Sequence, residues 1–171
     1  MKAYIYREGG VPWRLEEVPD PEPGASEVLV EVQAAGVCGS DLHYRFGRLK
    51  PYRVPLIPGH EVAGTVVALG EGAQGVAVGE RVCVHYVISC ARCRNCDAGY
   101  DNRCHSRRSI GAHVSGGFAQ YLALPDRNVL ALPDSISMPQ GAIIGCAVST
   151  AYPALRHRDR IGERQHVAVG E

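Results

Sequence analysis

Four cysteines lie close together at a spacing that suits a metal ion. Cys90, Cys93, Cys96 and Cys104 follow the pattern C-x2-C-x2-C-x7-C. Thiolates at this spacing can close a tetrahedron around one Zn²⁺, and a shell of four sulfurs leaves no position for a substrate. The pattern therefore predicts a structural zinc. The other interpretation of the same residues is a disulfide cluster or four unrelated thiols.

A second metal site can be assembled from Cys38, His60 and Cys146. Each of the three stands next to a predicted strand or helix boundary and among small residues. Two thiolates and one imidazole leave the fourth position of a zinc ion open, as a catalytic zinc requires. Taken singly, each residue could instead be a buried thiol or a core histidine. Spacing alone cannot join residues that lie so far apart along the chain.

Short β-type segments must position these residues, because turn chemistry interrupts the chain often. The sequence contains 20 glycines and 11 prolines. Many short strands separated by turns favour a barrel or a sandwich over alternating strands and helices. We expect strands over residues 2–7, 14–18, 28–35, 59–69, 81–88, 117–124 and 128–132.

The pattern changes in the last part of the chain, where we expect helices over 138–146 and 149–156. A buried strand ending in glycine is expected over 166–170, and such a strand is how a nucleotide-binding βαβ unit begins. We therefore expect one domain over 1–160. Residues 161–171 are then the start of a Rossmann domain that is otherwise absent from this chain.

One glycine motif does not fit nucleotide binding. Gly70, Gly72 and Gly75 match G-x-G-x-x-G, but the motif binds a pyrophosphate only where a helix opens directly after it. The residues that follow are strand-like, with a further glycine at position 79. The motif is therefore interpreted as a hairpin turn.

Composition excludes several classes of function. The 18 basic and 18 acidic residues leave no net charge to attract nucleic acid, and no apolar run is long enough to cross a bilayer. The chain opens without an apolar signal segment, so we expect a cytoplasmic protein. A basic zinc ribbon that binds nucleic acid is the rival interpretation of the cysteine segment, but it lacks interleaved aromatic residues. We expect Arg92, Arg94 and Arg103 to offset the charge of the four thiolates instead.

Taken together, the motifs resemble the zinc-containing medium-chain alcohol dehydrogenases. They occur in the family's order and span the whole chain: CGSDLH at 38–43, GHEVAG at 59–64 followed by Gly70, the four-cysteine segment, GFA at 117–119, and GC at 145–146 with Thr150. The resemblance implies a mainly β fold with short helices, namely a GroES-like, partly open β-barrel with a zinc-bearing loop lobe at 89–108. It also implies two zinc ions, the structural one in this lobe.

The family's site residues carry over by position. Cys38, His60 and Cys146 become the ligands of the catalytic zinc, and Asp41 would bond the far nitrogen of His60, although it can also be a turn residue. Ser40 resembles the residue that accepts the alcohol proton. Among the remaining positions, His43 would be the outer member of the proton relay, Glu61 a carboxylate near the metal, Thr150 a nicotinamide contact and Tyr86 a wall of the substrate pocket.

The function implied is oxidation of a primary or secondary alcohol to an aldehyde or ketone with NAD or NADP, and the full-length protein is expected to form homo-oligomers. Because this chain has almost no nucleotide domain, we expect it to be inactive alone. The alternative is a stand-alone zinc-binding GroES-like module without catalysis. Cys83 belongs to neither metal set and is expected to pack as a small apolar residue.

Overall fold

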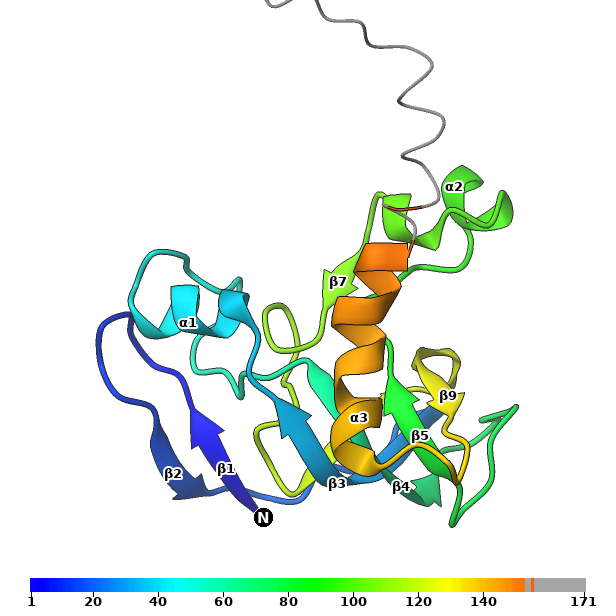
Figure 1. Ribbon diagram of the computed structural model, residues 1–171, viewed down its shortest axis with the longest axis horizontal. Coiled ribbons are helices and arrows are strands. Elements are labelled where there is room, and N and C mark those ends of the chain that lie inside the picture. Colours follow the sequence, from blue (N-terminus) through cyan, green and yellow to red (C-terminus); the bar gives the residue numbers. More distant parts are fainter. Residues whose placement is uncertain (153–154, 156–171) are drawn as a thin grey trace, which may run out of the picture.

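A computed structural model describes residues 1–152 and 155 of the chain. The predicted mainly β architecture with short helices is confirmed (Figure 1). A central sheet contains five strands in the order β8-β3-β4-β5-β9, and each neighbouring pair is antiparallel. Its strands are β3 (Glu27–Gly36), β4 (Glu61–Leu69), β5 (Arg81–Val84), β8 (Tyr121–Pro125) and β9 (Val129–Ala131).

The other elements are short and surround this sheet. Two hairpins pair β1 (Lys2–Ile5) with β2 (Arg14–Glu17) and β6 (Val87–Ile88) with β7 (Arg108–Ser109). The helical segments are α1 (Gly39–Arg45), α2 (Arg94–Asp97), η1 (Asp101–Arg103), η2 (Asp126–Asn128), α3 (Met138–Ile143) and the π-helical η3 (Ile144–Val148). Among the described residues, no helix is long and apolar enough to cross a membrane.

The core forms because alternate residues of the central strands are apolar. Val28 and Val30 of β3 are fully buried, whereas Glu31 between Val30 and the next valine is exposed. They pack with Val62 and Val66 of β4 in one cluster. This two-residue period turns one face of the strand towards the core and the other towards solvent. The predicted burial of Cys83 is also confirmed, since the residue is 3 % exposed in a neighbouring cluster.

Several predicted boundaries differ from the structure. The strand expected over 81–88 is two strands, because the chain leaves the sheet at His85 and Tyr86 between β5 and β6. Helix α1, whose first residues are the glycine and serine after Cys38, was not predicted from the sequence. The strand expected over 59–69 begins only at Glu61, so His60 lies in the preceding loop.

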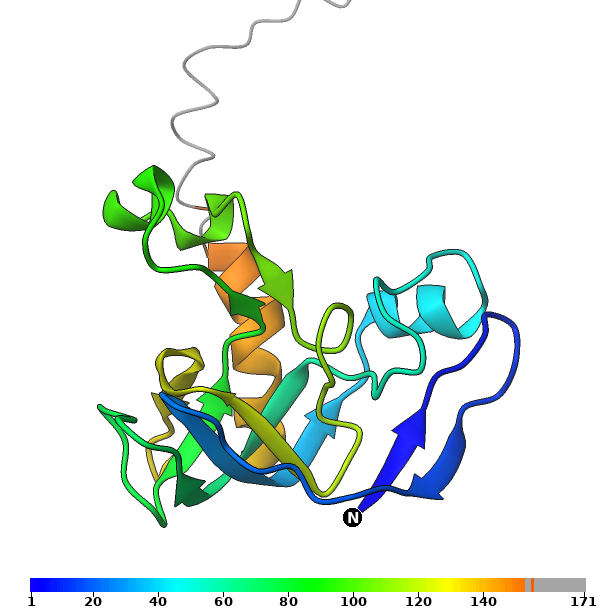
Figure 2. The same ribbon diagram turned by 180° about the vertical axis from the view of Figure 1, so that it is seen from behind.

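The helices expected over 138–146 and 149–156 form one run as far as the structure describes it. Regular helix ends at Ile143, a π-helical turn follows over Ile144–Val148, and helical residues continue through Tyr152. Cys146 therefore lies inside a π-helical turn and not between two helices. Figure 1 shows this run, in orange, rising across the sheet towards the lobe that carries α2, and Figure 2 shows the same arrangement from behind. The end of the second helix and the strand expected over 166–170 fall outside the described residues.

The glycine motif at 70–75 is a hairpin connection, as predicted. It joins β4 to β5, which pair antiparallel, and no helix opens after it. Gly70 packs against the main chain, since an added Cβ would lie 1.8 Å from the carbonyl oxygen of Gly24. The glycines of this motif therefore serve the turn and close backbone packing.

Candidate metal centres

The four cysteines of the lobe lie close enough together to share one ion. Their Sγ atoms all lie within 4.8 Å of one another, and those of Cys93 and Cys96 are 3.5 Å apart. Sulfurs at tetrahedral positions about 2.3 Å from Zn²⁺ would be about 3.8 Å apart, whereas a disulfide requires about 2.05 Å. The separation therefore fits metal ligation, and the cysteines are unpaired.

Main-chain N–H groups stabilise thiolate in this cluster. The N–H groups of Cys96 and His105 lower the pKa of Cys93 to about 6. The N–H of Cys90 donates to the Sγ of Cys104 at 3.3 Å. Partial burial and then the neighbouring Cys93 sulfur raise the pKa of Cys96 to about 11. Adjacent thiolates repel one another, so full ionisation of the cluster requires a cation. The compensation expected from the three arginines stays a prediction.

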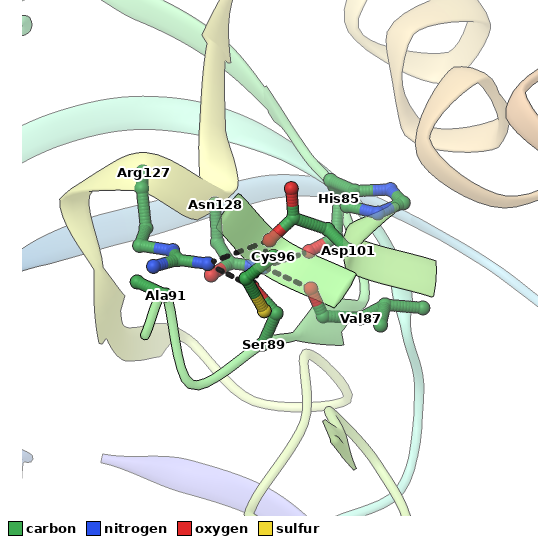
Figure 3. Close-up of a pocket in the computed structure, with 8 residues that line it drawn as sticks. All are labelled: His85, Val87, Ser89, Ala91, Cys96, Asp101, Arg127 and Asn128. Carbon is green, nitrogen blue, oxygen red and sulfur yellow. Dashed lines mark hydrogen bonds and ion pairs between the residues drawn. The ribbon is translucent and has the colours of Figure 1, made fainter. Parts of the chain in front are cut away.

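A polar network attaches this lobe to the sheet (Figure 3). The Arg127 guanidinium lies 3.2 Å from Asp101, and both side chains bond the Ser89 hydroxyl, which donates to Asp101 and accepts from Arg127. The side-chain amide of Asn128 donates to the carbonyl oxygens of His85 and Val87, at 2.7 and 2.8 Å. These contacts border a cavity of about 470 Å³. These hydrogen bonds therefore connect the cysteine loop to the loop that follows β5.

A second cluster brings together residues from three distant segments. One ligand atom each from Cys38, His60, Glu61 and Cys146 lies within 4.8 Å of the others. The set predicted from sequence was the two cysteines and the histidine, with Glu61 near the metal. The carboxylate of Glu61 lies in the donor set itself, so it is a potential fourth ligand. Gly36 leaves room for it, because an added Cβ there would lie 2.2 Å from a Glu61 carboxylate oxygen.

The ends of the central strands position this cluster. Cys38 follows β3 and is the N-cap of α1, while His60 directly precedes β4. Since β3 and β4 are paired, the two residues meet at one end of the sheet. Cys146 arrives from η3, and Gly145 before it lies against β5, where an added Cβ would be 1.7 Å from the carbonyl oxygen of Val84. Only glycine permits this approach.

Asp41 lies behind the histidine of the cluster. Its side chain is fully buried, and its Oδ2 accepts a hydrogen bond from the Cys38 N–H at 2.9 Å. Its Oδ1 lies 3.6 Å from the Nδ1 of His60 and lacks a hydrogen-bond partner among the described residues. With Nδ1 facing a carboxylate, Nε2 is the nitrogen left for a metal, which is the usual arrangement around a zinc-binding histidine.

The electrostatics of the cluster also fit a cation. Burial, followed by the nearby Cys38 and Glu61, raises the pKa of Cys146 to about 12. A half-buried thiol beside a second sulfur and a carboxylate resists ionisation at neutral pH unless a positive charge is close. A divalent ion supplies that charge, and sulfur, imidazole and carboxylate are all zinc ligands. The residues present therefore fit zinc.

A cavity of about 400 Å³ opens onto this cluster. Cys38, His60 and Cys146 line it, together with three residues predicted from the sequence to lie there or near the cofactor: Ser40, Tyr86 and Thr150. The ring of Tyr86 is tilted against that of His60, with centroids 5.3 Å apart. His43 is exposed on α1 and is not among the lining residues.

Four further residues of the cavity lining were not predicted from the sequence. Tyr44, Tyr52, Arg107 and His113 all line it. They come from α1 and from loops, and no spacing in the sequence connects them. His113 was assigned no partner from sequence, yet its ring stacks on that of Tyr52 with centroids 3.8 Å apart.

The fold and the two clusters agree with comparisons to known proteins. Residues 24–134 match the alcohol dehydrogenase GroES-like domain. The chain belongs to this family of zinc-containing medium-chain alcohol dehydrogenases. An alcohol dehydrogenase of Moraxella sp. (strain TAE123) is 40 % identical over 162 residues, covering 93 % of this chain and 48 % of the relative.

Solved structures give the same result. An NAD-dependent alcohol dehydrogenase superposes with a TM-score of 0.87 at 34 % identity, covering 95 % of this chain and 48 % of the other. A cobalt- and zinc-bound thermostable alcohol dehydrogenase from Pyrobaculum aerophilum has a TM-score of 0.85 at 33 % identity, with coverages of 92 % and 49 %. The chain spans about half the length of the relatives it matches.

Proposed function

We propose that this chain forms the catalytic part of a zinc-dependent dehydrogenase that oxidises a primary or secondary alcohol to an aldehyde or ketone with NAD or NADP. The observation that supports this most strongly is the meeting of Cys38, His60 and Cys146 at the wall of a cavity. Three protein ligands beside open space are what a catalytic zinc requires.

Glu61 would determine whether the fourth coordination position of that site is free. Its carboxylate lies within 4.8 Å of the other three ligand atoms, so it can occupy the fourth position when no substrate is present. A substrate oxygen would then displace it. Because Glu61 is 6 % exposed, its displaced carboxylate would stay buried and close to the cluster.

A bound zinc would act as a Lewis acid that makes a bound alcohol more acidic. The chain's own residues would orient that alcohol and remove its proton. Ser40 lines the cavity beside Cys38 and would accept the alcohol proton, and His43, exposed on the same helix, would pass it to solvent. Asp41 would hold the His60 ring in place.

The cofactor would approach from the side of η3. Thr150 lies just beyond this π-helical turn and lines the same cavity, so we propose it as a contact of the nicotinamide. We also propose that residues 1–160 form the GroES-like catalytic domain. Most cofactor contacts, and any homo-oligomer interface, would lie in the half of the relatives' length that this chain does not span.

Metal analysis and ligand binding test this function together. The chain should hold two zinc ions, and exchange for Co²⁺ should give a visible spectrum that butane-1,3-diol shifts. Only an open site can respond, because four sulfurs leave no position for the diol. Changing Cys146 to Ser should abolish the shift while the cysteine lobe keeps its ion. A single zinc with no response to the diol would instead indicate a zinc-binding module without catalysis.

A further inference from the structure

The cavity that opens onto the metal ligands also has a basic residue and several hydrogen-bond donors in its lining. Arg107 lines it, and among the described lining residues none is a carboxylate. Arg107 has no acidic partner in the described part of the chain, and the hydrogen bond from its guanidinium to the carbonyl oxygen of Asn102 is long at 3.5 Å. A guanidinium carries five N–H donors, so most of its capacity remains for a ligand.

His113 lines the same cavity as Arg107 and adds a second donor. The Ser109 N–H donates to the Nδ1 of His113 at 3.1 Å, so the proton of the neutral ring is on Nε2. Stacking on Tyr52 fixes the plane of the ring. Burial, followed by the charges of Arg108 and Arg107, lowers the pKa of His113.

We propose that the cavity selects alcohols that carry an anionic group, a carboxylate or a phosphate. Arg107 binds that group with the help of His113, while the hydroxyl faces the cluster of Cys38, His60 and Cys146. Guanidinium groups bind both anions through paired charge-assisted hydrogen bonds. A neutral alcohol would make no charge-assisted hydrogen bond with the guanidinium. This inference rests on the proposed function, since it assumes that the hydroxyl binds at the open metal site.

Matched ligand pairs test the inference on the Co²⁺-substituted chain. The first pair is 3-hydroxybutyrate and butane-1,3-diol, which share a carbon skeleton and differ in one charge. The second pair is glycerol 3-phosphate and glycerol. Titrations followed by the cobalt spectrum give a dissociation constant for each. We expect the anionic member of one pair to bind about 10- to 100-fold more tightly than its neutral partner, and the better pair identifies carboxylate or phosphate as the group.

Arginine variants test whether Arg107 itself binds the anionic group. Arg107→Ala should remove the tighter binding of the anionic alcohol and leave the dissociation constant of the neutral alcohol unchanged. Arg107→Lys should restore part of the tighter binding. Arg108→Ala is the matched control, because Arg108 is the next residue and does not line the cavity. If Arg108→Ala weakens binding of the anionic alcohol as much as Arg107→Ala does, the effect comes from the overall positive charge and not from a contact with Arg107. The inference is then wrong.

The remaining outcomes separate this inference from the proposed function. If both members of each pair bind equally, anion selection is refuted while the open metal site stands. If no alcohol of either kind shifts the cobalt spectrum, the open site itself is refuted, and anion selection fails with it. Because Arg107 is exposed, its variants should fold and bind metal as the parent chain does.

Discussion

The Nδ1 of His60 lies 3.6 Å from the Oδ1 of Asp41, a carboxylate that is completely buried. This oxygen has no hydrogen-bond partner within the described residues, although Oδ2 of the same carboxylate accepts a hydrogen bond from the Cys38 N–H. A buried carboxylate next to a histidine fixes the orientation of the ring and raises its basicity as a ligand. Asp41 therefore supports two members of the metal cluster at once.

Replacing this carboxylate should weaken metal binding. Asp41→Asn keeps the size of the side chain and removes its charge, so we expect zinc affinity at the Cys38–His60–Cys146 cluster to fall about 10- to 100-fold. Competition with a chelator measures the affinity. Asp134→Asn changes a fully exposed carboxylate and should have no effect. Equal zinc affinity in the two variants would contradict the role given to Asp41.

The position of Cys146 should depend on the glycine before it. In Gly145→Ala, the new Cβ would meet the Val84 carbonyl at 1.7 Å, so η3 must move away from β5. We expect a loss of more than about 2 kcal/mol in the free energy of unfolding, together with loss of metal from the cavity cluster.

Gly39 provides the matched control, because it also flanks a candidate ligand, Cys38. An added Cβ there meets nothing within 4 Å, and the residue lies in α1. Gly39→Ala should leave stability unchanged or raise it by up to about 1 kcal/mol. Chemical unfolding of both variants decides the matter, and equal stabilities would show that the approach of η3 to β5 is not required.

The lobe cysteines should act as a set. Cys96→Ser removes one of four thiolates, so we expect the lobe to lose its zinc and the chain to retain one ion. Cys83→Ala is the control: this cysteine is 3 % exposed and packs in an apolar cluster, so both ions should stay. Elemental analysis gives the zinc count for each. A Cys96→Ser chain that still holds two zinc ions would contradict four-sulfur ligation.

The pKa of His113 should be lower than that of an ordinary histidine. Burial and the charges of Arg108 and Arg107 lower its pKa, so its NMR midpoint should lie below the ordinary value of about 6.5. Arg108→Gln should raise that midpoint. Because the folded pKa is depressed, the stabilisation is present above about pH 6.5 and is lost as pH falls through the folded value.

Stability measurements check the sign of this effect. Relative to His113→Gln, the parent chain should lose stability when pH falls from about 7 to below the folded pKa. A midpoint above 6.5, or a stability difference that does not change with pH, would show that His113 is not held near these arginines.

The sequence predicted local features better than distant ones. The spacing of Cys90 to Cys104 is short enough for residue order alone to indicate one ion. The residues over 28–35 likewise predicted the strand that is β3 in the structure. By contrast, Cys38 and Cys146 meet only because β3 ends beside β4 and η3 lies on β5. No local pattern records that meeting, so only the resemblance to a known family joined them.

Two further features escaped prediction for physical reasons. The π-helical turn at Ile144–Val148 depends on tertiary contact of Gly145 with β5, and not on local propensity. The wall formed by Tyr52, Arg107 and His113 comes from irregular loops, where side chains meet through the path of the main chain. Periodicity carries no information about such loops.

X-ray absorption at the zinc edge of the intact chain tests the central claim most directly, which is that two different zinc sites exist. Four sulfurs in the lobe and two in the cavity cluster give a mean of about three sulfurs per zinc, at about 2.3 Å, with nitrogen or oxygen at about 2.0–2.2 Å completing the average shell. We expect two zinc ions per chain with this mixed spectrum. A single zinc per chain surrounded by sulfur alone would show that Cys38, His60 and Cys146 do not share an ion.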